Sequence, residues 1–162
     1  MNKLKEVAEK YIGQTEISGN KGFNDKKFEK KLKEVGWDVG LAWCSFFAEA
    51  CAKEAYPEKV KELDKLFSGS ATATYKNFEL AGYKVSQTPE VGNLAVWRYG
   101  NTWKGHIGIV VETTDTNYKT VEGNTNDGKG REGYIVAKHS HSLFAPLQPA
   151  GLNLIGFINP VK

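Results

Sequence analysis

The sequence predicts an α+β domain in which N-terminal helices pack on one side of an antiparallel sheet of about five strands. Over roughly the first 80 residues, apolar side chains recur at steps of three and four, which is typical of amphipathic helices. After Gly82 the chain changes to short runs of β-branched and aromatic residues separated by polar turns. Helices followed by strands, without regular alternation, indicate the α+β class. A chain of 162 residues fits one domain, with a helical part (about 1–82) and a β part (about 83–162).

Four of the expected helices are amphipathic or short. The first covers residues 3–12 and ends at Gly13, and the second is capped by Asn24 or Asp25 and ends before Gly36. Two short helices follow over residues 58–67 and 71–81, the last opening after a serine that can act as its N-cap.

The remaining helix, residues 42–55, differs from the others. It is rich in alanine, lacks glycine and proline, and is apolar around most of its circumference. A helix of this kind is expected at the centre of the domain, buried by its neighbours.

The five expected strands form a meander. They cover residues 93–97, 105–111, 118–122, 134–137 and 154–158. The loop over 125–132, which contains two glycines and several charges, is expected to be the most mobile segment.

Composition and charge exclude several classes of protein. Hydrophobic residues at 40% and charged residues at 25% indicate a globular chain rather than a disordered one. The 22 basic and 19 acidic side chains leave a net charge of +3, so we expect no nucleic-acid partner. We also expect a monomer.

Two further observations concern membranes and export. No stretch approaches the roughly 18–20 consecutive apolar residues that span a bilayer, so no membrane insertion is expected. Residues 1–10 lack the apolar core of a secretory signal. We therefore expect synthesis in the cytoplasm, with any target outside it reached by another route.

Cys44 is the first candidate for chemistry. It stands where the alanine-rich helix begins, and the partial positive charge of a helix N-terminus lowers the pKa of a thiol there. Its backbone N–H could also serve as an oxyanion donor. The alternative is that Cys44 is a small buried hydrophobe, as we expect for Cys51 seven residues later. On one helix the two lie about 10.5 Å apart, too far for a disulfide, so both are expected as free thiols.

A cysteine nucleophile needs a base, and the chain offers three histidines. His106 lies at the start of a strand between Gly105 and Gly108, which permit close approach of another group. His139 and His141 are expected to be solvent-exposed loop residues. No cluster of cysteine, histidine and carboxylate accompanies them, so no metal site and no cofactor are predicted.

A third polar group is needed to orient the imidazole. In an antiparallel hairpin, the end of the next strand lies beside the start of the strand that carries His106, so Glu122 or Asn124 could fill this role. Both share one face if the strand continues to Asn124.

Four segments together resemble a known family. They are residues 43–47 (Trp-Cys-Ser-Phe-Phe), 92–97 (Gly-Asn-Leu-Ala-Val-Trp), 105–110 (Gly-His-Ile-Gly-Ile-Val) and 122–124 (Glu-Gly-Asn). In this order they resemble the CHAP family, the cysteine, histidine-dependent amidohydrolases/peptidases, over about residues 36–160. The helices ahead of the first segment resemble those of phage-encoded peptidoglycan hydrolases.

The resemblance implies a papain-like fold and a cysteine-dependent amidase or endopeptidase. By position the nucleophile is Cys44, the base His106 and the orienting group Glu122, with Asn124 as a second polar group. The implied substrate is bacterial peptidoglycan, cleaved between muramic acid and the stem alanine or within the peptides, as in bacteriolytic endolysins. Some members have an aspartate-rich calcium loop ahead of the cysteine; here the ten residues before Cys44 contain one aspartate, Asp38, so no calcium is expected.

Exposed aromatic residues would serve substrate binding, and Trp43 and Trp103 are the candidates, whereas Trp97 is expected in the core. Two alternatives stand beside the lytic enzyme. One is an antibacterial amidase effector delivered by a secretion system. The other is a non-catalytic module that binds cell wall or carbohydrate, with Cys44 and His106 merely buried.

Overall fold

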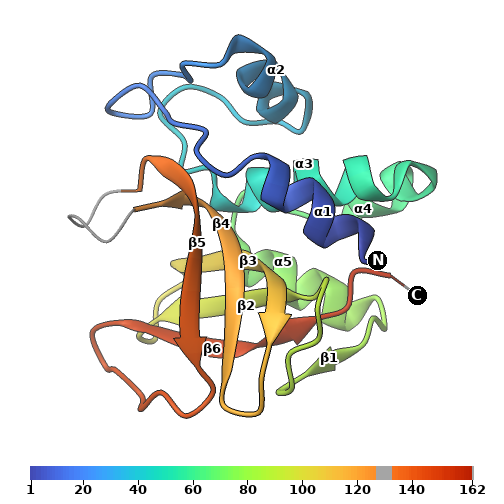
Figure 1. The fold of residues 1–162 in the computed structure, drawn as a ribbon, viewed down its shortest axis with the longest axis vertical. Coiled ribbons are helices and arrows are strands. Elements are labelled where there is room, and N and C mark those ends of the chain that lie inside the picture. Colours follow the sequence, from blue (N-terminus) through green and yellow to red (C-terminus); the bar gives the residue numbers. More distant parts are fainter. Residues whose placement is uncertain (127–132, 162) are drawn as a thin grey trace.

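Helices on one side and an antiparallel sheet on the other make up the molecule, as predicted (Figure 1). The structure is a computed structural model that describes residues 1–126 and 133–161, so most of the loop predicted over 125–132 lies outside the described residues. The described helices are α1 (Lys3–Lys10), α2 (Lys26–Glu34), α3 (Cys44–Ala55), α4 (Val60–Leu66) and α5 (Ala71–Leu80), with a 3₁₀ turn η1 (Pro57–Lys59).

The sheet has six described strands in the order β1-β6-β2-β3-β4-β5, and every pairing is antiparallel. The strands are β1 (Val85–Ser86), β2 (Leu94–Tyr99), β3 (Gly105–Thr113), β4 (Asn117–Thr125), β5 (Ile135–Ser142) and β6 (Leu152–Ile158). Five of them correspond to the predicted runs. The sixth, β1, was missed because two half-buried residues carry no periodic pattern.

Capping residues set where the helices begin. The Asp25 side chain accepts hydrogen bonds from the backbone N–H groups of Lys27 and Phe28, which confirms a cap at that position. Ser70 caps α5 in the same way by accepting from the N–H of Ala73. Both helix starts were therefore readable from local chemistry.

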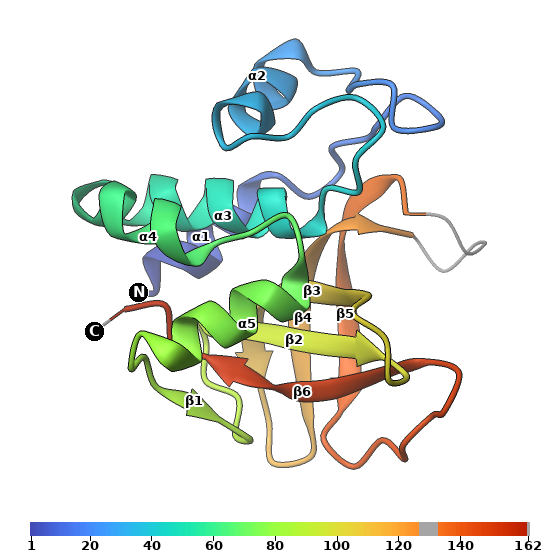
Figure 2. The ribbon, with the colours of Figure 1, turned by 180° about the vertical axis from the view of Figure 1, so that it is seen from behind.

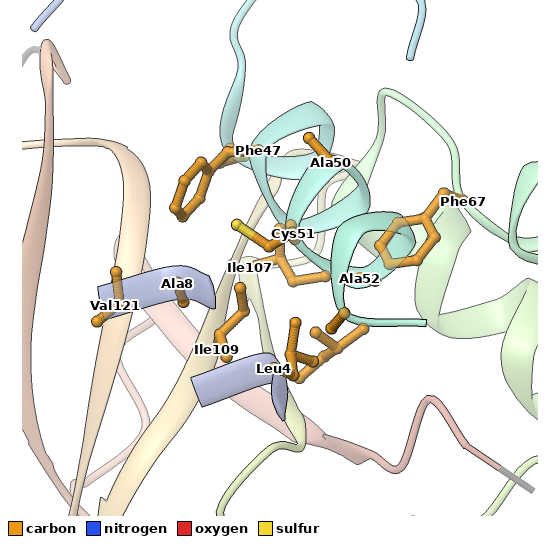
Figure 3. Packing of buried hydrophobic residues seen from close by; sticks show 14 of the residues in the cluster. Leu4, Ala8, Phe47, Ala50, Cys51, Ala52, Phe67, Ile107, Ile109 and Val121 are labelled. Atoms are coloured by element: carbon orange, nitrogen blue, oxygen red, sulfur yellow. The ribbon is translucent and has the colours of Figure 1, made fainter. Parts of the chain in front are cut away.

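Helix α3 is the centre of the helical layer, as its composition predicts. Nine of its 12 residues are buried, and it contacts α1, α2, α4, α5 and the strands β3 and β4. Figure 3 shows Cys51 on α3 facing the apolar side chains near Ile107, among residues contributed by α1 and the sheet. Cys51 is 0% exposed and is a free thiol, so its predicted packing role is confirmed.

The two faces of the sheet differ. One face, with Leu94, Ile107 and Ile109, joins the helices in the main core. The other face carries a smaller cluster built from strand residues, including Trp97 and Tyr118, with partly buried Leu143 and Leu154 packed against it. Figure 2 shows α5 running beside β2, on the same side as the other helices.

Strand β5 corrects one prediction. His139 and His141 lie within this strand and are partly buried, so the assignment of both to an exposed loop is wrong. The strand forms an edge of the sheet, and exposed Lys138, Ser140 and Ser142 alternate with half-buried neighbours. The run looked like a loop because an edge strand with one solvated face needs few apolar residues.

No helix among the described residues combines the length and the apolar character needed to cross a membrane.

Candidate active site

Cys44 is the first residue of α3, so its thiol stands at a helix N-terminus. The preceding residue, Trp43, makes no side-chain capping hydrogen bond. The first turn of a helix leaves backbone N–H groups without a helical carbonyl partner, and here no side chain of the N-cap residue takes one up. The N-terminal end of α3 therefore offers the thiol sulfur a positive electrostatic environment.

His106 is the second residue of β3, a strand that packs against α3. It pairs across the sheet with Trp97 on β2, whose ring lies 5.8 Å from the imidazole, centroid to centroid. Its side chain is 15% exposed. The Cys44 side chain lies close enough to the imidazole to raise the pKa of His106, so the first residue of α3 and the start of β3 bring the thiol and the imidazole near one another.

Glu122 on β4 holds the imidazole from its other side. Its Oε2 lies 2.8 Å from Nε2 of His106, and its side chain is 4% exposed. Because Nε2 is engaged by the carboxylate, Nδ1 is the ring nitrogen left for the thiol. The three side chains thus form a line of thiol, imidazole and carboxylate.

The charges in this line stabilise one another. Burial on its own would lower the pKa of His106, but the negative charge of Glu122, the interaction with Cys44 and the hydrogen bond with Glu122 outweigh it and raise the pKa of His106 to about 10. Burial would likewise raise the pKa of Glu122, yet the charge and hydrogen bond of His106, together with a hydrogen bond from His141, hold that pKa well below its usual range. The arrangement therefore favours an imidazolium paired with a carboxylate at neutral pH.

Two glycines make room for this geometry. A Cβ at Gly108 would lie 2.7 Å from Cγ of Glu122, so only glycine leaves space for the glutamate side chain to cross β3 toward His106. A Cβ at Gly123 would lie 2.6 Å from Cβ of Phe47 and 2.8 Å from the Trp43 ring. Glycine there lets β4 approach the first turn of α3 closely.

Asn124 is arranged differently from Glu122. The pairing of β4 with β5 shifts between Glu122 and Thr125, and Asn124 has a φ of 52°, in the left-handed region. The simple alternation that would put Asn124 and Glu122 on one face therefore does not hold. Within the described part of the chain, the side chain that hydrogen-bonds to the His106 ring in the orienting role is Glu122.

The two tryptophans proposed for substrate contact have opposite surroundings. Trp43 is 0% exposed, and its indole N–H donates to Glu16 at 3.1 Å. It packs edge-on against Phe23 and Phe47. A ring without exposed surface cannot line a groove, so the prediction for Trp43 is wrong and its role is core packing. Trp103 is 73% exposed in the turn between β2 and β3, where its carbonyl accepts from Thr72.

His141 was not assigned to the site from the sequence, yet the structure brings it there. Its Nε2 lies 2.7 Å from Oε1 of Glu122 and 3.0 Å from Oγ1 of Thr120. The sequence carries no clear signal for this placement, because residues 138–142 are all polar and a polar run does not distinguish an edge strand from a loop. Trp97, predicted in the core, is 6% exposed, which confirms that prediction.

Among the residues that the structure describes, no group of three or more histidine, cysteine, aspartate or glutamate side chains is arranged to hold a metal ion. Cys51, the other thiol, is fully buried, and burial raises its pKa well above the usual value. Cys44 is thus the one of the two cysteines that has both a helix N-terminus and an imidazole beside it.

Part of the sequence that contains these residues matches a known protein family. Residues 36–124, more than half of the chain, match the family model described as CHAP domain. No curated protein and no solved structure matches the chain. The matched segment contains Cys44, His106, Glu122 and Asn124.

Proposed function

Because the chain belongs to the CHAP family, whose name implies a cysteine- and histidine-dependent amidohydrolase or peptidase, we propose that it hydrolyses an amide bond of bacterial peptidoglycan through an acyl-enzyme on Cys44. The bond is either the one between muramic acid and the stem alanine or one within the stem or cross-bridge peptides. The observation that supports the proposal is the line of thiol, imidazole and carboxylate formed by Cys44, His106 and Glu122 at the start of α3.

The first half of the reaction transfers the acyl group. At the start the thiol proton already lies on Nδ1 of the His106 imidazolium, and the Cys44 sulfur attacks the carbonyl carbon of the substrate amide as a thiolate. The imidazolium then gives that proton to the nitrogen of the leaving amine as the C–N bond breaks. Glu122 stabilises the imidazolium through Nε2 throughout, because a carboxylate at 2.8 Å favours the charged ring.

The second half releases the product. His106 takes a proton from water, the resulting hydroxide attacks the thioester carbon, and the C–S bond breaks to leave the Cys44 thiolate beside the His106 imidazolium. The negative charge that develops on the carbonyl oxygen in both halves needs hydrogen-bond donors. The Cys44 N–H in the first turn of α3 is one such donor, and a second is assigned to the segment 37–42 that leads into the helix.

Two substitutions test the assignment. Cys44→Ala and His106→Ala are each expected to abolish lysis of purified cell walls, since one removes the nucleophile and the other its base. Cys51→Ala is the matched control, because it removes a thiol that has no imidazole beside it and is expected to leave lysis close to wild type. Melting followed by circular dichroism checks that each variant is folded. Lysis retained by a folded Cys44→Ala or His106→Ala protein would reject the proposal.

Alkylation separates this enzyme from a non-catalytic wall-binding module. Near neutral pH, iodoacetamide is expected to label Cys44 much faster than Cys51 in the native protein, because a thiol paired with an imidazole reacts as thiolate. A binding module has no need of such a thiol and would leave both cysteines equally inert. The buried position of Trp43 also removes one of the two aromatic rings on which the binding-module alternative depended.

The family match supports the reaction class and does not support a phage origin. We propose action on the cell wall after release or export from the cytoplasm, whether as a lysin or as a secreted effector. Mass spectrometry of muropeptides released from several defined cell walls identifies the cleaved bond from its new termini. A new amino terminus on the stem alanine indicates an amidase, and termini inside the peptides indicate an endopeptidase.

A further inference from the structure

The Glu122 carboxylate has two oxygens with different partners. Oε2 faces His106 at 2.8 Å, whereas Oε1 receives Thr120 Oγ1 at 2.5 Å and His141 Nε2 at 2.7 Å. A carboxylate turns freely about its last bond unless both oxygens are held. The orientation of Oε2 toward His106 therefore depends on what holds Oε1.

The His141 ring is itself held in place by neighbours that do not take part in the reaction. It stacks on Tyr118 with ring centroids 5.2 Å apart and an interplanar angle of 26°, and it lies 4.8 Å from the ring of Trp97. Tyr118 and Trp97 are both nearly buried, so they provide a rigid support. This support directs Nε2 at the carboxylate.

The ring nitrogens of His141 could have formed hydrogen bonds with water instead of with Glu122. Its side chain is 28% exposed and borders a cleft of about 410 Å³ that is also lined by Ser140, Ser142 and Asn153. The ring nevertheless turns Nε2 inward, away from water that was available as a partner. The contact with Glu122 is thus a specific one rather than a consequence of burial.

We propose that His141 is a positioning residue, which donates from Nε2 to Oε1 of Glu122 and so presents Oε2 to His106. The inference rests on the proposed roles of Cys44, His106 and Glu122. His141 acts through Glu122 and does not touch the substrate. Without its hydrogen bond, Oε1 keeps one donor, Thr120, and the carboxylate samples orientations that leave the imidazole less well held.

The test compares three substitutions on β5. His141→Phe keeps a flat ring on Tyr118 but has no donor, whereas His141→Gln has an amide that can donate to the same oxygen. His139→Gln is the matched control: His139 lies two residues away on the same strand, and its Nε2 contacts Thr125 at 3.0 Å rather than Glu122. His141→Ala, a second donor-free variant, is used if His141→Phe does not fold.

The main measurement is the rate of Cys44 alkylation by iodoacetamide near neutral pH, which needs no cell wall. The donor-free variants are expected to react about 10-fold more slowly than wild type, the loss typical of one hydrogen bond to a charged group. His141→Gln is expected to recover most of that rate, and His139→Gln to match wild type. Equal rates for donor-free and wild-type proteins, or no recovery in His141→Gln, would overturn the proposal.

A second measurement keeps the two proposals distinguishable. In wall hydrolysis, the donor-free variants are expected to lower kcat with little change in KM, because His141 does not contact the substrate. A wild-type protein that fails to cleave any wall would overturn the proposed substrate, while the alkylation comparison would still decide the role of His141. A change confined to KM would instead assign His141 to substrate binding and overturn the positioning role.

Discussion

Replacing Glu122 by glutamine keeps nearly the same side-chain shape but removes the negative charge. That charge offsets the lowering of the His106 pKa by burial. The lost interaction is a charge-assisted hydrogen bond of 2.8 Å from a side chain that is 4% exposed. Such bonds contribute about 1.5–3 kcal/mol, and about 1.4 kcal/mol corresponds to one pKa unit or to a factor of ten in rate. We therefore expect the pKa of His106 to fall from about 10 by about one to two, and kcat/KM to fall about 10- to 100-fold.

The assay is an NMR titration of isotopically labelled imidazoles in wild type and in Glu122→Gln, together with wall-lysis kinetics. Glu112→Gln is the matched control, because Glu112 lies on the neighbouring strand β3 and pairs with Lys119 and Lys138 at the surface, away from His106. It is expected to leave the His106 titration unchanged. If the pKa of His106 is the same in wild type and in Glu122→Gln, then Glu122 does not stabilise the imidazolium and the orienting role passes to Asn124.

Three further predictions follow from the same structure. Gly108→Ala places a methyl group 2.7 Å from Cγ of Glu122 and is expected to lower wall lysis at least about 10-fold. It is also expected to lower the melting temperature, because overlap at a buried position costs about 1–3 kcal/mol. Unchanged lysis would show that Glu122 can shift without loss. Trp43→Ala removes a fully buried ring and is expected to lower the free energy of unfolding by about 3–5 kcal/mol in urea denaturation. A loss of wall binding without loss of stability would instead indicate that Trp43 contacts the substrate. The pKa of Glu122 is lowered and that of His106 is raised from 6.5 to about 10. The free energy of unfolding lost in Glu122→Gln should therefore be greatest between the ordinary pKa values of the two groups, and should shrink both in acid and as pH rises toward 10. A loss independent of pH would contradict the ion pair.

The helical half of the fold was predictable because its signals are local. Spacing of apolar residues, the Asp25 and Ser70 caps and the composition of α3 each depend on residues within a few positions of one another. The same signals placed Cys44 at a helix start. They failed for the second part of β5, residues 138–142, because these residues are all polar and lie at a sheet edge, and a polar run does not distinguish an edge strand from a loop.

The candidate site was predictable in its residue types and only partly in its geometry. A cysteine at a helix start, a histidine at a strand start and an acid on the next strand are a chemical pattern that can be read along the chain. The place of Asn124 was not readable, because the shift in pairing beyond Glu122 and the positive φ that accompanies it arise from how β4 meets β5. The burial of Trp43 likewise results from packing against Phe23, which is twenty residues earlier in the chain.

By itself, the sequence determined the class of fold, the central position of α3 and the set of groups available for nucleophilic chemistry, since these follow from short-range periodicity and from side-chain chemistry. Only the tertiary structure decided which groups meet: the sulfur with the imidazole, the imidazole with Oε2 of Glu122, and His141 with the other oxygen of that carboxylate. The physical reason is that strand register and close approach at two glycines are properties of paired segments, and no single segment contains them.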